Sequence, residues 1–295
     1  MNVIIKIQGG LGNQLFQYAC ARALALKHNT SLVLNTSWFR KYEEGVSPRN
    51  FLLENFRLGE NFQISQQELV KPSRFERLLQ TLGWSSSFSF IEKQHYQYDP
   101  MIWNTPRFTF QNIILLGYWQ SYLYFQGIAE QLKKELIPIN QISQHYQQYA
   151  EQIGQTNSVM IHIRRGDYVS LPHVSNLYAT LPISYYQKAT HLIQQKTGKC
   201  HFFLFSDDYL WVKKHFDFLE NYTCIESEAG QSSVISELQL MARCRHHVLA
   251  NSSLSWWGAW LAQYSGQYVI CPHQWTKTTN QLDDLLPAQW IRLEP

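Results

Sequence analysis

Two adjacent arginines, Arg164 and Arg165, end an apolar run and are followed by Gly166 and Asp167 in the stretch IHIRRGDY. Guanidinium groups present forked N–H donors that match the oxygens of a phosphate. Gly166 permits a tight backbone, and Asp167 either holds an arginine in place or acts on a hydroxyl of a bound molecule. The alternative is an arginine in an ion pair between domains beside a solvated neighbour. The pattern favours a local anion site.

Two other polar stretches, SDD at 206–208 and NSSLS at 251–255, also follow apolar runs. Asn251 and Ser252 are N-cap candidates, and a helix N-terminus suits a phosphate, although capping without a ligand is the simpler reading. One aspartate of SDD either bonds a nucleoside or caps the next helix. Adjacent carboxylates lack the spacing of a D-x-D metal site, and no His, Cys, Asp or Glu cluster has metal-ligand spacing. We therefore predict no metal.

The elements that must position these stretches form a regular series in the second half. The sequence predicts strands at 158–163, 201–205, 222–225, 246–250 and 267–271, which alternate with helices near 183–197, 209–216, 234–244 and from 253. Such a series is typical of a doubly wound parallel sheet, whose ligands bind at the carboxyl ends of the strands. The three polar stretches are therefore expected to converge at one edge.

The first half opens with a strand at 2–7, a glycine loop, a helix at 11–28 and a strand at 31–35. The loop GGLGNQ fails the G-x-G-x-x-G pattern because residue 15 is Leu, and Asn35 stands where a ribose-binding acid would be, which argues against a nicotinamide or flavin enzyme. A strand over 113–121 and a helix over 121–136 should follow. Residues 40–110 show no clean periodicity.

A Gln-rich stretch bounded by Pro138 and Gly154 is the expected domain boundary. The prediction is an α/β chain with two Rossmann-like domains, 1–154 and 155–295. The last segment is a candidate for packing back on the first domain.

The bulk composition excludes several classes. The chain has 295 residues, 45% hydrophobic and 16% charged, with a net charge of +3, which is too mild for a nucleic-acid footprint. Five widely spaced cysteines indicate reduced thiols. No signal peptide or membrane-spanning run is evident. We expect a cytoplasmic protein and leave open a peripheral contact with the inner face of the membrane.

The stretches GGLGNQLFQYA, HIRRGDY, SDD and NSSLSWWGAWL, in this order, closely resemble the bacterial α-1,2-fucosyltransferases of glycosyltransferase family 11. The resemblance extends from Gly9 to about Pro272 and is weakest over 40–110. It implies a GT-B type fold, in which two Rossmann-like domains face a cleft. It also implies a metal-independent enzyme without a cofactor. That enzyme would transfer fucose with inversion from GDP-β-L-fucose to the 2-hydroxyl of a terminal β-galactoside.

The resemblance also implies roles for individual residues. Arg164 should hold the β-phosphate of GDP and Arg165 should support it with its charge. The resemblance assigns the guanosine to His162 and Asp207, and the diphosphate to Ser252 and Ser253. From the first domain, which would be mainly on the acceptor side, the glycine loop with Gly10 and Asn13 would reach the donor.

The general base and the exact substrates are left open by the sequence. Asp167 is the first candidate for the base and His173 the second. The main alternative is another GT-B enzyme that uses a different deoxyhexose or forms a different linkage. The second alternative is a carbohydrate-binding protein without turnover, but a neutral glycan would give the arginine pair no anionic partner. The preferred galactoside and the oligomeric state are not specified.

Overall fold

The computed structural model describes residues 1–40, 49–69, 88–93, 96–104, 112–228, 230, 233–278 and 282–294. The chain divides into two compact units, Met1–Ile139 and Asn140–Pro295. The boundary expected at 154/155 is wrong by about one helix: it falls within helix α4 (Gln144–Gln155), which packs on helix α9 (Ser233–Arg243) of the second unit. The Gln-rich stretch is therefore part of the second unit.

The first unit is built on a parallel sheet of five strands in the order β3-β2-β1-β5-β4. The strands are β1 (Asn2–Lys6), β2 (Ser31–Asn35), β3 (Phe62–Ser65), β4 (Phe88–Lys93) and β5 (Asn112–Gly117). The sequence indicated β1, β2 and β5, whereas β3 and β4 at the two edges were missed. Edge strand β3 is largely exposed and therefore has no apolar alternation to detect.

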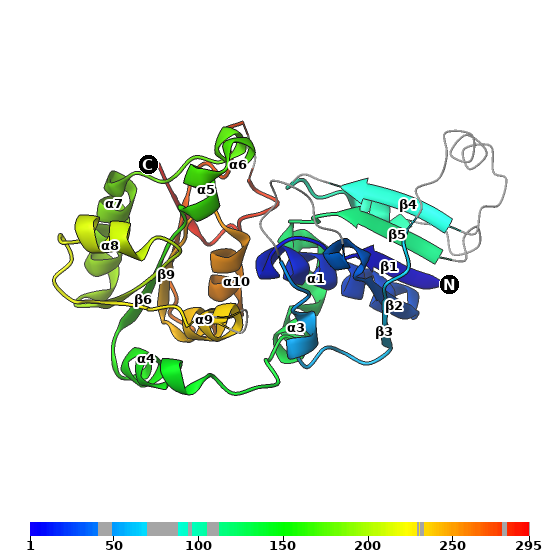
Figure 1. The fold of residues 1–295 in the computed structure, drawn as a ribbon, viewed down its shortest axis with the longest axis horizontal. Helices are drawn as coiled ribbons and strands as arrows, with labels where there is room; N and C mark the ends of the chain where they lie inside the picture. The colour runs from blue at the N-terminus through cyan, green and yellow to red at the C-terminus, as the bar shows by residue number, and fades with distance from the viewer. Residues whose placement is uncertain are drawn as a thin grey trace. The chain divides into compact units, whose positions relative to one another are not determined.

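Helix α1 (Leu11–His28) has the bounds that the sequence predicts, but it is buried almost all round rather than along one stripe. Its polar side chains bond to the loops around it. Gln17 donates from Nε2 to the carbonyl of Gly117 at 3.0 Å and accepts from the backbone N–H of Gln8, also at 3.0 Å. This side chain joins the carboxyl ends of β1 and β5, which are neighbours in the sheet (Figure 1).

The helix expected over 121–136 is interrupted in the structure. Two 3-10 turns, Tyr122–Tyr124 (η4) and Gln126–Ile128 (η5), precede a shorter helix α3 (Ala129–Glu135). Ser121 caps the first turn by accepting from the N–H of Leu123 at 3.3 Å. An apolar period near three fits a 3-10 turn as well as an α-helix, so the pattern could not separate them. Three more 3-10 segments in this unit are η1 (Ser37–Arg40), η2 (Leu53–Asn55) and η3 (Pro100–Asn104).

The second unit contains a parallel sheet of six strands in the order β11-β10-β9-β6-β7-β8. The strands are β6 (Ser158–Ile163), β7 (His201–Ser206), β8 (Tyr222–Cys224), β9 (His246–Val248), β10 (Val269–Pro272) and β11 (Ile291–Leu293). Counted along the chain, this is the Rossmann order 3-2-1-4-5-6. The strand order reverses between β6 and β9, where such sheets bind ligands.

Four helices of this unit agree with the series read from the sequence, namely α7 (Ile183–Thr197), α8 (Tyr209–His215), α9 and α10 (Ser253–Leu261). The short helices α5 (Gly166–Ser170) and α6 (Pro172–Leu177) lie where the sequence indicated a loop. Figure 1 shows α7 and α8 on one side of strands β6 and β9, with α9 and α10 on the other. The predicted doubly wound arrangement is confirmed.

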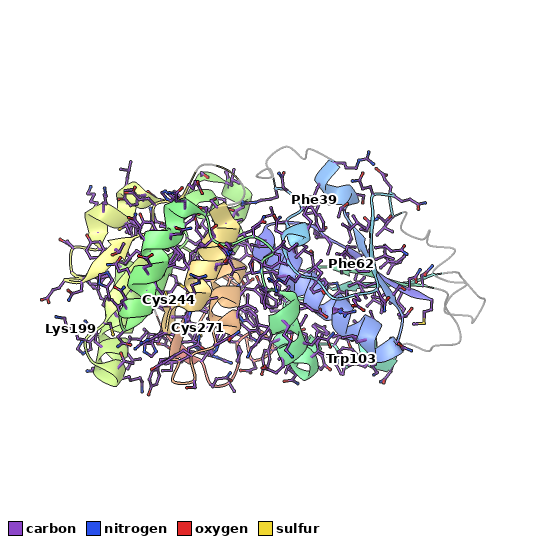
Figure 2. All side chains as sticks on the ribbon, turned by 90° about the horizontal axis from the view of Figure 1, so that it is seen from below. Phe39, Phe62, Trp103, Lys199, Cys244 and Cys271 are labelled. Carbon is purple, nitrogen blue, oxygen red and sulfur yellow. The ribbon has the colours of Figure 1, made fainter. Side chains whose placement is uncertain are left out.

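The sixth strand, β11, was not expected. Residues Ile291–Leu293 pair with β10, so this part of the tail is a strand of the second unit's own sheet. The five cysteines are free thiols, and Figure 2 marks Cys244 and Cys271 in the second unit, both buried. Within the described ranges, the structure has no helix that is long and apolar enough to cross a membrane.

Candidate functional site

The arginine pair lies at the carboxyl end of β6, beside the point where the strand order reverses. Strand β6 is buried along its whole length, and Val159, Ile161 and Ile163 point into the core shared with α7. Side chains alternate along a strand, so His162 and Arg164 point to the opposite face, where α9 and α10 lie. The alternation along this buried strand thus directs Arg164, and not Arg165, toward α9 and α10.

Arg164 is held by two carboxylates. Its Nη1 lies 2.6 Å from Oδ2 of Asp207, and its Nη2 lies 2.8 Å from Oδ1 of Asp167. Burial alone would lower the pKa of Arg164, but the two carboxylates outweigh it and raise the pKa above the ordinary value. The guanidinium therefore carries a fixed charge in a fixed orientation.

Strand register explains the pair between Arg164 and Asp207. Ile163 of β6 is paired with Ser206 of β7, so the next residue of each strand stands beside the other. Oδ1 of Asp207 also accepts from the backbone N–H groups of Arg165 and Gly166, at 2.8 and 3.0 Å. Burial would raise the pKa of Asp207, but the charge of Arg164 and these two N–H donors hold the pKa below its usual value.

Gly166 is required by this close approach. A Cβ built at Gly166 would lie 2.8 Å from Oδ2 of Asp207. The glycine therefore lets the loop backbone donate to the carboxylate that anchors Arg164.

Arg165 is positioned by the second aspartate of SDD. Its Nε donates to Oδ2 of Asp208 at 3.1 Å, and its guanidinium carbon lies 4.1 Å from the ring centroid of Trp211. Asp208 also caps α8, because its Oδ1 accepts from the N–H of Trp211 at 3.1 Å. The two aspartates thus divide the roles: Asp207 anchors Arg164 and the loop, whereas Asp208 caps a helix and fixes Arg165.

His162 precedes Arg164 by two residues and therefore points to the same face of the sheet. The side chain is buried, and its Nδ1 is sealed from solvent with no hydrogen-bond partner among the described residues. Burial, together with the charge of Arg164, lowers the pKa of His162 to about 4. The imidazole is therefore neutral at pH 7.

The third polar stretch lies at the start of α10, after β9. Ser252 is the N-cap residue in extended conformation, and its hydroxyl makes no capping bond to the first turn of α10. Asn251 donates from Nδ2 to the carbonyls of Ala179 and Trp275, and its Oδ1 is buried without a partner. The sequence left both an anion and ordinary capping open at this helix start, and the structure shows no side-chain cap from Ser252.

Both serines lie where the sequence placed them, with Ser253 as the first residue of α10. Trp256 and Trp257 of the same helix are fully buried and belong to the core. The three stretches therefore converge at one edge, as the topology predicted.

Gly10 and Asn13 lie at the corresponding edge of the first unit. Gly10 is the N-cap residue of α1, and Asn13 accepts through Oδ1 from Nε2 of Gln120 at 2.7 Å. Gln120 follows Trp119, a buried residue with φ 55 that turns the chain after β5. The structure thus joins the loops after β1 and β5, while the predicted contact of Gly10 and Asn13 with a donor stays a prediction.

Among the described residues, no group of three or more His, Cys, Asp or Glu side chains is arranged to hold a metal ion. The side chain of His173 lies outside the described part of the structure.

The free energy of unfolding should fall when the pH is lowered from 7 towards 4. Burial lowers the pKa of both His162 and His247 to about 4, so between pH 6.5 and 4 the unfolded chain binds protons that the native state does not. Each imidazole should contribute up to about 1.4 kcal/mol per pH unit in this window. The lowered pKa of Asp207 adds a loss at lower pH, because its carboxylate is stabilised in the native state.

Urea denaturation at pH 7, 6 and 5 measures this effect. His247→Gln should flatten the profile, whereas His191→Gln, on the exposed face of α7, should leave it unchanged. A wild-type unfolding free energy that is constant from pH 7 to 5 would contradict the prediction.

The two Rossmann-like units, with an anion-suited edge on the second sheet, define a glycosyltransferase of the GT-B type. The chain belongs to glycosyl transferase family 11, whose family model matches residues 2–294. The fold class and the family resemblance read from the sequence are therefore confirmed.

Relatives and solved structures agree with this assignment. The chain is 30% identical over 300 residues to the alpha-1,2-colitosyltransferase of Escherichia coli, and the alignment covers 99% of both chains. It is 22% identical to galactoside alpha-(1,2)-fucosyltransferase 1 of Oryctolagus cuniculus, over 97% of this chain and 72% of that one. A mutant of Arabidopsis thaliana FUT1 in complex with GDP has a similar fold, with a TM-score of 0.55 and 11% identity over 91% of this chain and 69% of that one.

Proposed function

We propose that this glycosyltransferase moves L-fucose from GDP-β-L-fucose to the 2-hydroxyl of a terminal β-galactoside, with inversion and without a metal. The observation that carries the proposal is the arginine pair, held by SDD at the ligand-binding edge of a family 11 chain. The rabbit relative is named for this linkage, and the Arabidopsis neighbour binds GDP.

The charges at this edge indicate how the diphosphate would be held. Three carboxylates surround two guanidiniums, so the edge is not a bare cationic patch. Each guanidinium has five N–H donors, of which the carboxylates use a minority, so both keep donors for phosphate oxygens. The uncapped start of α10 adds backbone N–H groups and a positive dipole end. Leaving-group stabilisation would therefore be shared by Arg164, Arg165 and α10.

Fixed donors of this kind accelerate a displacement, because negative charge grows on the diphosphate as the glycosidic bond breaks. The carboxylates orient the guanidiniums before the donor binds, so little reorganisation is needed during the reaction. Asp167 is ion-paired with Arg164, which supports a role as an anchor for that arginine. We also propose Asp167 as the general base for the acceptor hydroxyl.

Incubation of the protein with GDP-fucose and lactose, with and without EDTA, tests this proposal. We expect a trisaccharide with an α-1,2 linkage, formed at the same rate in both reactions, and NMR of the product identifies the linkage. A different linkage, no product from any β-galactoside, or loss of activity in EDTA would contradict the corresponding part.

A second candidate donor is another GDP-deoxyhexose, because the 30% identical relative is named a colitosyltransferase. Competition between GDP-fucose and GDP-colitose for one acceptor decides between them. If neither sugar is transferred, a thermal-shift comparison of GDP, UDP and ADP remains informative, since a binding protein for neutral glycans would respond to none of them.

A further inference from the structure

Glu237 is a largely buried carboxylate that the proposed chemistry does not use. It lies in the second turn of α9, and only one of its two oxygens is bonded. Oε1 accepts from Oγ of Ser227 at 2.7 Å and from Oη of Tyr146 at 3.2 Å. The described residues provide no recorded hydrogen-bond donor for Oε2, which is also not sealed from solvent.

The position of Glu237 is fixed at the same sheet edge as the arginine pair. Leu204 of β7 is paired with Cys224 of β8, so the residues after β8 run beside the SDD loop. Tyr209 confirms this proximity, since its hydroxyl donates to Oε1 of Glu226 at 2.7 Å. Ser227 follows directly and bonds Glu237. Figure 1 shows helix α9 on the side of β6 and β9 opposite α7 and α8. Alternation along β6 directs His162 and Arg164 to the same side, because Ile161 and Ile163 point into the core shared with α7.

The surroundings of Glu237 disfavour its charged form. Burial raises the pKa of Glu237 above its ordinary value, although the bonds from Ser227 and Tyr146 oppose the rise, and the charge of Asp207 adds to it. A glutamine would accept the same two hydroxyl bonds without a buried charge. The structural bonds alone therefore do not explain a glutamate.

Asp207, which the resemblance assigned to the guanosine, uses both of its carboxylate oxygens in bonds within the protein. Its Oδ1 accepts two backbone N–H groups, and its Oδ2 accepts from Arg164. Glu237, in contrast, has one oxygen, Oε2, with no recorded donor among the described residues. Guanosine carries several hydrogen-bond donors, namely N1–H, the 2-amino group and the two ribose hydroxyls, and a carboxylate can only accept.

We propose that Oε2 of Glu237 accepts a hydrogen bond from the guanosine of the sugar-nucleotide donor and so selects the nucleotide. This inference rests on the proposed function, since it presumes a guanosine diphosphate at the arginine pair. The partner on the ligand is a donor group of the base edge or of the ribose, and analogues that lack one donor at a time distinguish the two.

Equilibrium binding by calorimetry tests this proposal with wild-type protein and Glu237→Gln. The ligands are GDP, IDP without the 2-amino group, N1-methyl-GDP, and the 2′-deoxy and 3′-deoxy forms of GDP. A hydrogen bond to a charged group corresponds to roughly 10–150-fold in affinity, so at least one analogue should bind wild type about tenfold or more weakly than GDP. Glu237→Gln should weaken GDP by a similar factor and abolish the discrimination against that same analogue.

The matched control is Glu226→Gln, which changes an exposed carboxylate next to Ser227 on the loop after β8 and should keep the discrimination. A purely structural role of Glu237 would weaken all ligands equally, and that result would overturn the inference. Wild type that binds every analogue as tightly as GDP would overturn it without any variant. In both of these cases GDP still binds and the proposed function stands, whereas wild type that binds no GDP would reject the proposed function and this inference with it.

Discussion

Replacing Arg164 with alanine should reduce the rate of fucosyl transfer by about 10²–10³-fold without unfolding the protein. Arg164 carries a permanent charge fixed by Asp167 and Asp207, and its remaining donors are available to the departing diphosphate. Removing a preoriented donor costs most in the transition state, where the charge develops. The measurement is kcat with GDP-fucose and lactose, accompanied by a thermal melt.

Further variants separate the effect of the charge of Arg164 from that of its forked geometry. Arg164→Lys keeps the charge but loses the fork that spans two carboxylates, so it should recover only a small part of the rate. Arg292→Ala removes another guanidinium of the second unit, one that pairs with the exposed Asp283, and should leave turnover within about twofold. If Arg164→Ala kept more than roughly a third of the wild-type rate, Arg164 would not be a catalytic residue.

Glu135→Ala should lower the free energy of unfolding by about 3–5 kcal/mol, because it leaves a buried guanidinium without its partner. Glu135 and Arg22 are joined by a 2.8 Å ion pair, and their side chains are only 8% and 9% exposed. Tyr18 donates to Oε2 of Glu135 at 2.6 Å and Gln131 donates to Oε1 at 2.7 Å. The Glu135 carboxylate is therefore the common acceptor of Arg22, Tyr18 and Gln131. A Cβ at Gly59 would collide with Arg22 and Glu135, which shows how closely the backbone covers this network.

Urea denaturation measures the loss, and two comparisons define its origin. Lys133→Ala removes the exposed pair with Glu130 on the same helix and should change the unfolding free energy by about 0.5 kcal/mol or less. The double variant Arg22→Met, Glu135→Leu should recover most of the loss, because an apolar pair leaves no buried charge unpaired. A loss below about 1 kcal/mol for Glu135→Ala would show that water reaches Arg22 and replaces its partner.

The loop after β6 shows why local sequence was sufficient to locate the site. A buried strand must end where a run of apolar residues meets charges, and parallel connections bring all such ends to one edge. Arg164, Asp207 and Ser252 could therefore be assigned to the same edge although they are far apart in the chain. The interrupted helix after Ser121 was misjudged because the same residue pattern fits an α-helix and a 3-10 turn. Edge strand β3 was missed because it is largely exposed and shows no apolar alternation.

The sequence alone determined five of the strands in the second unit and the longer helices between them, the edge where its polar stretches meet, and the family. Periodicity and strand ends are properties of neighbouring residues, so they can be read without coordinates. Only the tertiary structure decided the partners: Asp207 for Arg164, Asp208 for Arg165, and Glu135 for Arg22 across 113 residues. Such pairs depend on strand register and on distances of a few ångströms between distant segments. For the same reason the sequence could not single out Glu237, one acidic residue of an amphipathic helix, because Ser227 and Tyr146, which bond it, belong to other segments.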